Sequence, residues 1–135
     1  MKYPEKFKDY VRSKAKEYKL VIGAGEYNMD IYWEEEEEQG NHFTAAKIKI
    51  RTEYLFCNLH IHPPLYDYFK NKDLNQVDRI ILHEMCHVLT EPFYEVVISN
   101  LAPIEQTYFE QIRERQTQRI ANAIIYANPE IISKL

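Results

Sequence analysis

The sequence is poor in the residues that mark several classes of protein. It has only two cysteines, Cys57 and Cys86, too few for the disulfide framework of a small secreted domain. Its 3 glycines argue against a loop-rich or disordered chain. No apolar stretch approaches the ~18 residues that a membrane-spanning helix needs. We therefore expect a cytoplasmic globular protein with reduced thiols and no membrane partner.

An excess of positive charge is also missing. The formal net charge is -4 at pH 7, whereas nucleic-acid-binding proteins concentrate lysine and arginine on one face, so nucleic acid is not an expected partner. The 135 residues have the length of one domain, and we expect 1–135 to form a single one, with a homo-oligomer left open. The last three residues, Ser133 to Leu135, match a peroxisomal address, but so short a match does not decide the location.

Hydrophobic periodicity predicts an α+β fold. Apolar residues at spacings of three and four indicate helices, and alternating apolar and polar residues indicate strands. Pro92 predicts that the second long helix stops near Thr90, and Pro103 suits the first turn of the last one. Three short strands separated by turn signals predict a small antiparallel sheet, which a fourth strand could extend. The expected helices cover residues 4–18, 74 or 76 to 90, and 103–127, with a helical turn at 65–70, and the expected strands cover 27–33, 43–51 and 54–61.

Residues 83–87 read H-E-M-C-H, an H-E-x-x-H motif inside the apolar run 77–89. If the run is helical, His83 and His87 lie one turn apart on one face and can bind one metal ion. Glu84 follows about 100° further round the helix, where its carboxylate can reach a water on the metal without being a ligand. Burying these polar side chains is costly unless they are paired or metal-bound. The pattern predicts a zinc site, and the alternative is an accidental spacing.

A catalytic zinc site needs a third protein ligand and keeps the fourth position for water. No histidine follows His87 in the chain, so the third ligand has to be a carboxylate. On the long helix expected at 103–127, Glu114 lies on an inward-facing stripe of small and apolar residues and is the first candidate. Glu110, one turn earlier on this stripe, is the second. The alternative is that both glutamates are solvated partners of neighbouring arginines.

The order of these elements resembles that of the minimal gluzincin metallopeptidases, and of small zincin-like proteins of phages and prokaryotes. In these the H-E-x-x-H helix is followed by a helix with the pattern E-x-x-T/V-x-x-I/L-A, which reads E-R-Q-T-Q-R-I-A at residues 114–121 here. The resemblance spans roughly residues 40–125, and its one specific motif is H-E-x-x-H. It implies that the two histidines and Glu114 bind zinc and that Glu84 is the general base of a peptidase.

Peptide hydrolysis at such a site also needs contacts to the substrate. Tyr94, His60, His62 and Tyr126 are candidates for the donor that stabilises the developing oxyanion, although the sequence places none of them. His60 and His62 share one strand face and could hold a second metal, but surface imidazoles are the simpler interpretation. In this class of fold an extended substrate adds to the sheet edge nearest the metal helix, which we expect within residues 54–61. The expected function is zinc-dependent hydrolysis of a peptide or protein substrate.

Two alternatives stay open. The protein could be a catalytically silent zinc-binding module that interacts with other proteins, of phage or regulatory type, or it could hydrolyse a bond other than a peptide. A latent peptidase is a further possibility, because the apolar tail at residues 129–135 could cover the metal. Cys86, beside the motif, is expected to be a small buried hydrophobe.

Overall fold

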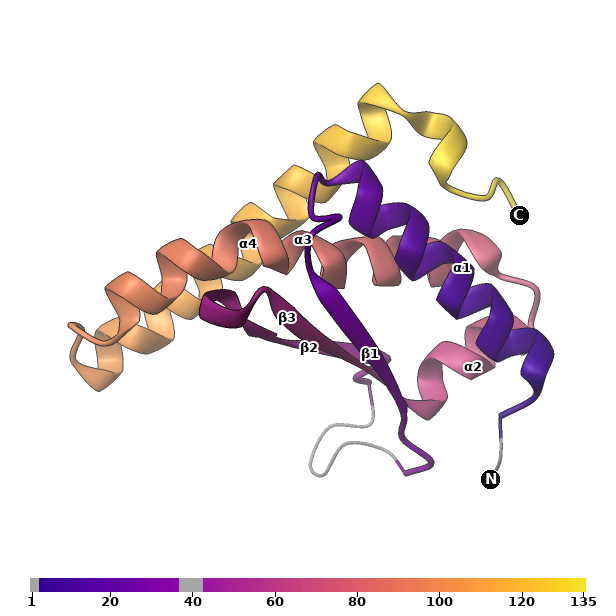
Figure 1. The fold of residues 1–135 in the computed structure, drawn as a ribbon, viewed down its shortest axis with the longest axis horizontal. Coiled ribbons are helices and arrows are strands. Elements are labelled where there is room, and N and C mark those ends of the chain that lie inside the picture. The colour runs from indigo at the N-terminus through magenta and orange to yellow at the C-terminus, as the bar shows by residue number, and fades with distance from the viewer. Residues whose placement is uncertain (1–2, 37–42) are drawn as a thin grey trace.

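The computed structural model describes residues 3–36 and 43–135, which fold as helices packed on a small sheet, an α+β arrangement (Figure 1). No helix in these ranges is long and apolar enough to span a membrane. The predicted helices at the N-terminus, around the motif and at the C-terminus are all present. In chain order the elements are α1 (Glu5–Val21), β1 (Asn28–Trp33), β2 (Ala46–Arg51), β3 (Phe56–Ile61), α2 (Pro63–Lys70), α3 (Leu74–Ile98) and α4 (Pro103–Ala127), with 3-10 turns at Thr52–Tyr54 and Pro129–Ile131.

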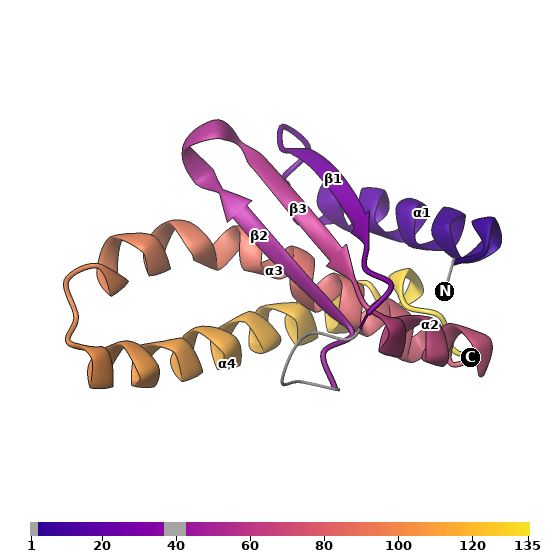
Figure 2. The same ribbon diagram turned by 90° about the horizontal axis from the view of Figure 1, so that it is seen from below.

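The three strands form a mixed sheet in the order β1-β3-β2, so the prediction of an antiparallel sheet is wrong (Figure 2). β2 and β3 are antiparallel neighbours joined by the turn Thr52–Tyr54, whereas β1 pairs in parallel with the other side of β3. Alternating apolar and polar residues predict that a segment is a strand, but not which strand it pairs with or in which direction. Side chains alternate between the two faces of the sheet in both parallel and antiparallel pairing. β3 is therefore the central strand, and β2 is an edge.

The predicted bounds of the shorter elements are nearly right. The strands end where predicted but begin one to three residues later, at Asn28, Ala46 and Phe56. The helical turn expected at 65–70 is a full helix, α2, which begins at Pro63. Proline suits this position because the first turn of a helix has no intrahelical acceptor for its N–H groups.

The motif lies in α3, which begins where predicted. The side chain of Asp73 accepts a hydrogen bond of 3.2 Å from the backbone N–H of Gln76 and so caps the first turn. The prediction that this helix stops near Thr90 is wrong. It continues past Pro92 and ends at Ile98. Proline removes a backbone donor, yet α4 packs along this part of α3, and such tertiary contacts can override a local preference.

The hydrophobic core surrounds α3, which contacts α1, α2, α4 and β2. Ile81, Leu82 and Met85, on the arc predicted to be apolar, are fully buried together with side chains of α1 and β3. Cys86 belongs to the same cluster, and burial raises the pKa of its thiol to about 12, which agrees with a small buried hydrophobe. With these side chains taken into the core, the remaining face of α3 is left for polar residues.

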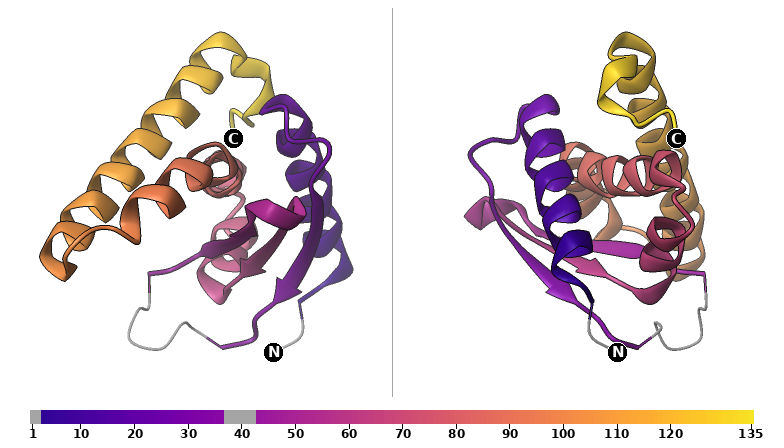
Figure 3. Two further views of the ribbon diagram at one scale, coloured as in Figure 1. Left: turned by 60° about the vertical axis from the view of Figure 1, so that its left-hand side comes forward. Right: turned by 90° about the vertical axis from the view of Figure 1, so that its right-hand side faces the viewer.

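The C-terminal segment packs into the same core, on the side of α3 away from the sheet (Figure 3). Ile131 and Ile132 are buried, and the hydroxyl of Tyr18 donates a 2.7 Å hydrogen bond to the carbonyl of Ile131. The backbone N–H of Ser133 donates to the fully buried carboxylate of Asp78, also at 2.7 Å. The tail considered as a cover for the metal is thus tied to α1 and to the first turns of α3.

Candidate metal centre

His83 and His87 lie one turn apart on the face of α3 that is turned towards α4. Their ring centroids are 5.0 Å apart, and the ring planes are nearly perpendicular, at 87°. His87 is buried and His83 is half-buried. The spacing of the motif therefore has the predicted effect, because it places two imidazoles side by side on one surface of the helix.

A carboxylate from α4 meets both imidazoles. The distance from Oε2 of Glu114 to Nε2 of His83 is 3.1 Å, and that from Oε1 to Nε2 of His87 is 3.3 Å. The helices α3 and α4 form a hairpin, which brings these distant parts of the sequence together (Figure 2). Imidazole nitrogen and carboxylate oxygen are both common zinc ligands. The structure thus brings the first candidate for the third ligand to the histidines, and its role as a ligand stays a prediction.

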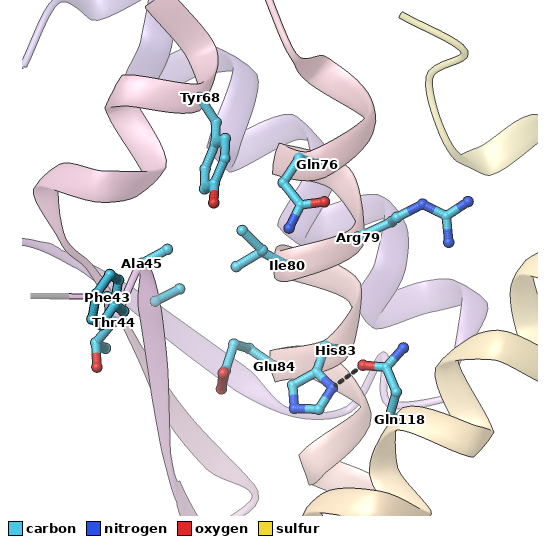
Figure 4. A pocket seen from close by; sticks show the side chains of 11 residues that line it. Phe43, Thr44, Ala45, Tyr68, Gln76, Arg79, Ile80, His83, Glu84 and Gln118 are labelled. Carbon is cyan, nitrogen blue, oxygen red and sulfur yellow. Dashed lines mark hydrogen bonds between the residues drawn. The ribbon is translucent and has the colours of Figure 1, made fainter. Parts of the chain in front are cut away.

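The second nitrogen of each imidazole is held by another side chain of α4. Nδ1 of His83 is 2.8 Å from Oε1 of Gln118, an oxygen that can only accept (Figure 4). Nδ1 of His87 is 3.4 Å from the hydroxyl of Thr117, whose own proton goes to the carbonyl of Arg113 at 2.8 Å. Each Nδ1 therefore faces an oxygen that can accept its proton, and Nε2 is the nitrogen directed to the Glu114 carboxylate, where a metal could bind.

The sequence had not assigned a role at the site to Gln118 or Thr117. They follow Glu114 by four and three residues, the spacings that place helical side chains on one face. Because a metal-binding histidine usually donates its free N–H to a fixed oxygen, this spacing was the signal that could have identified them.

Glu84 completes the group. Its carboxylate and the ring nitrogens of His83 and His87 lie within 4.8 Å of one another, an arrangement that could hold a metal ion. The carboxylate also accepts a hydrogen bond from the backbone N–H of Ile48 in β2. Burial raises the pKa of Glu84 above its ordinary value, and the neighbouring His87 and His83 oppose this rise only in part. A carboxyl group with a raised pKa is suited to proton transfer near neutral pH.

The protonation states of His83 and Glu114 are coupled. Hydrogen bonds from His83 and His87 hold the pKa of Glu114 well below its ordinary value, against the effect of burial. Burial alone would lower the pKa of His83, but the hydrogen bond to Glu114 and the charge of Glu84 outweigh it and raise that pKa. The contact with Glu114 thus favours the protonated form of His83 in the protein without metal, and a metal ion that binds competes with this proton.

Two hollows adjoin the site, one on each side of Glu84. The first has a volume of about 530 Å³ (Figure 4), and the second, of about 710 Å³, lies between β2 and the α3–α4 hairpin. Both reach Glu84 and Ala46, so a groove follows the edge of the sheet past the candidate base. The first hollow is lined by residues that include Ala45, Tyr68, Arg79, Ile80 and His83, and the second by residues that include Ile48, His87, Glu91, Arg113 and Glu114.

Glu110, the second candidate for the third ligand, faces other partners. Its carboxylate accepts hydrogen bonds from the guanidinium of Arg113 and from the hydroxyl of Tyr94. The same guanidinium lies 3.1 Å from Glu91 and 4.0 Å from the centre of the Tyr94 ring. Glu110 and Tyr94 therefore belong to an ion-pair cluster beside the histidines, and Tyr94 does not line either hollow.

The other candidates for substrate contacts lie elsewhere. Nδ1 of His60 is 2.8 Å from the carboxylate of Glu34, and its ring stacks on Tyr32. His62 is buried at the start of α2, and Tyr126 is 91% exposed near the end of α4. None of the three candidates lines either hollow. In residues 3–36 and 43–135, the His-Glu-His group of the motif is the one set of three or more ligand atoms that all lie within 4.8 Å of one another, and Glu114 contacts this set through its two histidines.

Comparisons with known proteins identify no relative. No protein-family model matches the chain, and no curated protein or solved structure matches it. The candidate metal centre is therefore defined by its own geometry, that is, by His83, Glu84 and His87 on α3 with Glu114 facing both histidines from α4.

Proposed function

We propose that this protein is a zinc-dependent peptidase of minimal gluzincin type, in which His83, His87 and Glu114 bind the ion and Glu84 is the general base. The observation that carries the proposal is the convergence of both Nε2 atoms on the Glu114 carboxylate while both Nδ1 atoms are held by α4. A histidine that only forms a hydrogen bond inside a protein needs a partner for one ring nitrogen. A metal-binding histidine usually has a partner for both, with the metal at one nitrogen and an oxygen acceptor at the other.

The donor set supports zinc over the harder divalent cations. Calcium and magnesium prefer ligand sets made of oxygen, and the two imidazoles do not suit them. Three protein ligands also leave a fourth position open, as in catalytic zinc sites. Zinc bound by these residues would supply Lewis-acid polarisation of a carbonyl and a water whose pKa is lowered to about 7.

Glu84 is placed to transfer the proton. Its carboxylate lies beside both histidines but belongs to neither of the two histidine–Glu114 contacts, so it is free to act as a base. In the proposed reaction Glu84 takes a proton from the attacking water and gives it to the leaving amine of the cleaved peptide. The bond from the N–H of Ile48 orients the carboxylate at the edge of β2, where the substrate would lie.

An extended peptide suits the edge of β2. The substrate-binding edge was expected within residues 54–61, which form β3. That strand is central and is paired on both sides, so β2 takes this place in the proposal. The N–H of Ile48 is directed towards Glu84 and away from β3, so alternate backbone groups of β2 face the groove. A peptide added as a further strand would pass Glu84 with its side chains directed alternately into the two hollows and away from them.

A silent zinc-binding interaction module is the second candidate function. The observation that favours it is a large exposed apolar surface on the α3–α4 hairpin, on which Phe93 and Ile104 are 75% and 82% exposed. Large exposed apolar surfaces of this kind mark sites of contact with another molecule. The two functions differ in whether Glu84 has a chemical task.

The test compares wild type with Glu84→Gln for zinc content and for cleavage of unfolded casein and of a mixed peptide library. We expect equal zinc content and a loss of cleavage of about 10²–10⁴-fold, the usual contribution of a general base. Glu53→Gln, in the turn between β2 and β3, is the matched control and should keep wild-type activity. A wild type that binds zinc but cleaves nothing would favour the interaction module, and a wild type that binds no zinc would contradict both.

A further inference from the structure

The α3–α4 hairpin carries an apolar surface that the rest of the described chain leaves exposed. Phe93, Val96, Ile104 and Tyr108 are 75%, 70%, 82% and 67% exposed. The loop that joins the two helices lies beyond the end of the sheet (Figures 1 and 2), so neither the strands nor α1 covers this part of the hairpin. Isolated exposed hydrophobic residues are ordinary, but a contiguous set on paired helices calls for a partner.

The exposed side chains form one face. On α3 they recur at spacings of three and four, from Leu89 through Phe93 to Val96, which places them on one side of the helix. Two shallow hollows of about 150 Å³ and 430 Å³ run between the helices, and Phe109 and Ile112 of α4 line both. A ridge of side chains from another helix could fill such hollows.

The area of this face fits a weak to moderate self-association. The exposed parts of its aromatic and aliphatic side chains amount to roughly 600 Å², at the upper limit of the largest apolar patch on a typical monomer. Two such faces packed together would bury roughly 1,200 Å², the lower limit of specific interfaces between proteins. A second copy therefore supplies enough contact area without any further surface.

Charges on the same face of α4 are self-complementary. Around Ile112, an acidic residue, Glu105, lies towards the start of the helix, and two basic residues, Arg115 and Arg119, lie towards its end. Within the part of the chain that the structure describes, neither arginine has an ion-pair partner. When two identical helices pack antiparallel about Ile112, Glu105 of each comes opposite the arginines of the other. Residues 89–119 contain five glutamates against three arginines and no lysine, and this net charge of -2 argues against an anionic membrane as the partner.

We propose that two copies of this chain associate through this surface, with their α3–α4 hairpins packed antiparallel about Ile112 as a four-helix arrangement. Antiparallel hairpins that share one apolar layer are a common solution for covering a two-helix face. The proposal does not depend on the bound metal or on peptidase activity, because none of the residues that carry it belongs to the metal centre.

The first experiment measures the mass of the full chain by analytical ultracentrifugation over a range of micromolar concentrations, with and without zinc. We expect wild type to approach twice the chain mass of 16.2 kDa. The double variant with Phe93→Glu and Tyr108→Glu should be a monomer whose helix content by circular dichroism equals that of wild type, since both side chains are exposed. Tyr54→Glu, at a residue that is 72% exposed in another region, is the matched control and should stay dimeric. A monomeric wild type would overturn the proposal.

The second experiment tests the antiparallel arrangement with charge reversals. Glu105→Arg alone places like charges at both ends of the interface, and so does Arg119→Glu alone, so each should weaken dimerisation by about tenfold or more. An equal mixture of the two variants restores opposite charges at both ends and should recover wild-type association. Because Glu105 also caps α4, helix content is compared by circular dichroism. Dimers that are indifferent to both reversals, or a mixture that stays monomeric, would overturn the arrangement.

Discussion

Nε2 of His83 lies 3.1 Å from Oε2 of Glu114, although 31 residues separate them in the chain. This contact links α3 to α4 at the point where His87 also reaches the same carboxylate. Without metal, this contact already holds the His83 ring and the Glu114 carboxylate beside each other. The candidate metal centre therefore has its His83, His87 and Glu114 side chains in contact before any ion binds.

We predict that Glu114→Ala loses zinc whereas Glu110→Ala keeps it. Glu114 faces both Nε2 atoms, while Glu110 is engaged by Arg113 and Tyr94. The measurement is the zinc content after dialysis against a weak chelator, with folding checked by circular dichroism. If Glu110→Ala lost the metal and Glu114→Ala retained it, the assignment of the third ligand would have to be reversed.

Gln118 is predicted to act on zinc affinity through His83. Replacing it by alanine removes the acceptor that fixes Nδ1–H, and such substitutions typically weaken metal binding by about 10–100-fold. Competition with a chromogenic chelator measures the change. Gln111→Ala, on an exposed position of the same helix, serves as the control and should leave affinity unchanged. Equal affinities for both variants would show that the 2.8 Å contact has no orienting role.

The His83–Glu114 pair predicts that zinc stabilises the protein more as the pH rises. The pKa of His83 is raised in the folded, metal-free protein, and this rise contributes to stability. The contribution is complete below the ordinary pKa of 6.5 and is lost as the pH rises through the pKa of the folded protein. The lowered pKa of Glu114 contributes stability that is present above the ordinary value of 4.5 and is lost as pH falls through the folded value. Zinc needs the deprotonated imidazole, so protons compete with it at low pH.

The measurement for this prediction is the unfolding temperature with and without zinc across a pH series. The increase produced by zinc should be larger at about pH 8 than at about pH 5.5. Calorimetric titrations in buffers of different ionisation enthalpy should also show proton release on binding. An increase that does not vary with pH, with no proton released, would contradict the coupling.

Asp78 is predicted to tie the C-terminal segment to the core. Its buried carboxylate accepts hydrogen bonds from the hydroxyl of Tyr10 at 2.6 Å and from the backbone N–H of Ser133 at 2.7 Å. Tyr10→Phe should cost about 1–3 kcal/mol, because a buried charged acceptor loses one of its donors. Deleting residues 129–135 should lower the unfolding temperature further. Tyr68→Phe is the control for Tyr10→Phe in urea unfolding, and a deletion that raised activity without destabilising the protein would instead support a latent tail.

Much of the candidate site could be predicted because it depends on spacing within single helices. The four-residue interval between His83 and His87 fixes two imidazoles on one face wherever α3 lies. The stripe that carries Glu114 also follows from helical periodicity, and the absence of later histidines excluded a downstream histidine as the third ligand. Contacts between helices could not be predicted in the same way. Spacing puts Gln118 and Thr117 on the face of Glu114, but only the packing of α4 on α3 brings them to the Nδ1 atoms of the histidines.

The sequence by itself determined the helices, the strands and the two-histidine motif, because local periodicity and proline or capping positions are properties of neighbouring residues. The tertiary structure alone decided that β1 pairs in parallel with β3, that β2 is the exposed edge beside Glu84, and that α3 continues past Pro92. It also selected Glu114 over Glu110 as the carboxylate that faces the histidines. These outcomes depend on which surfaces meet in space, and such long-range packing is not encoded in the spacing of residues along one element.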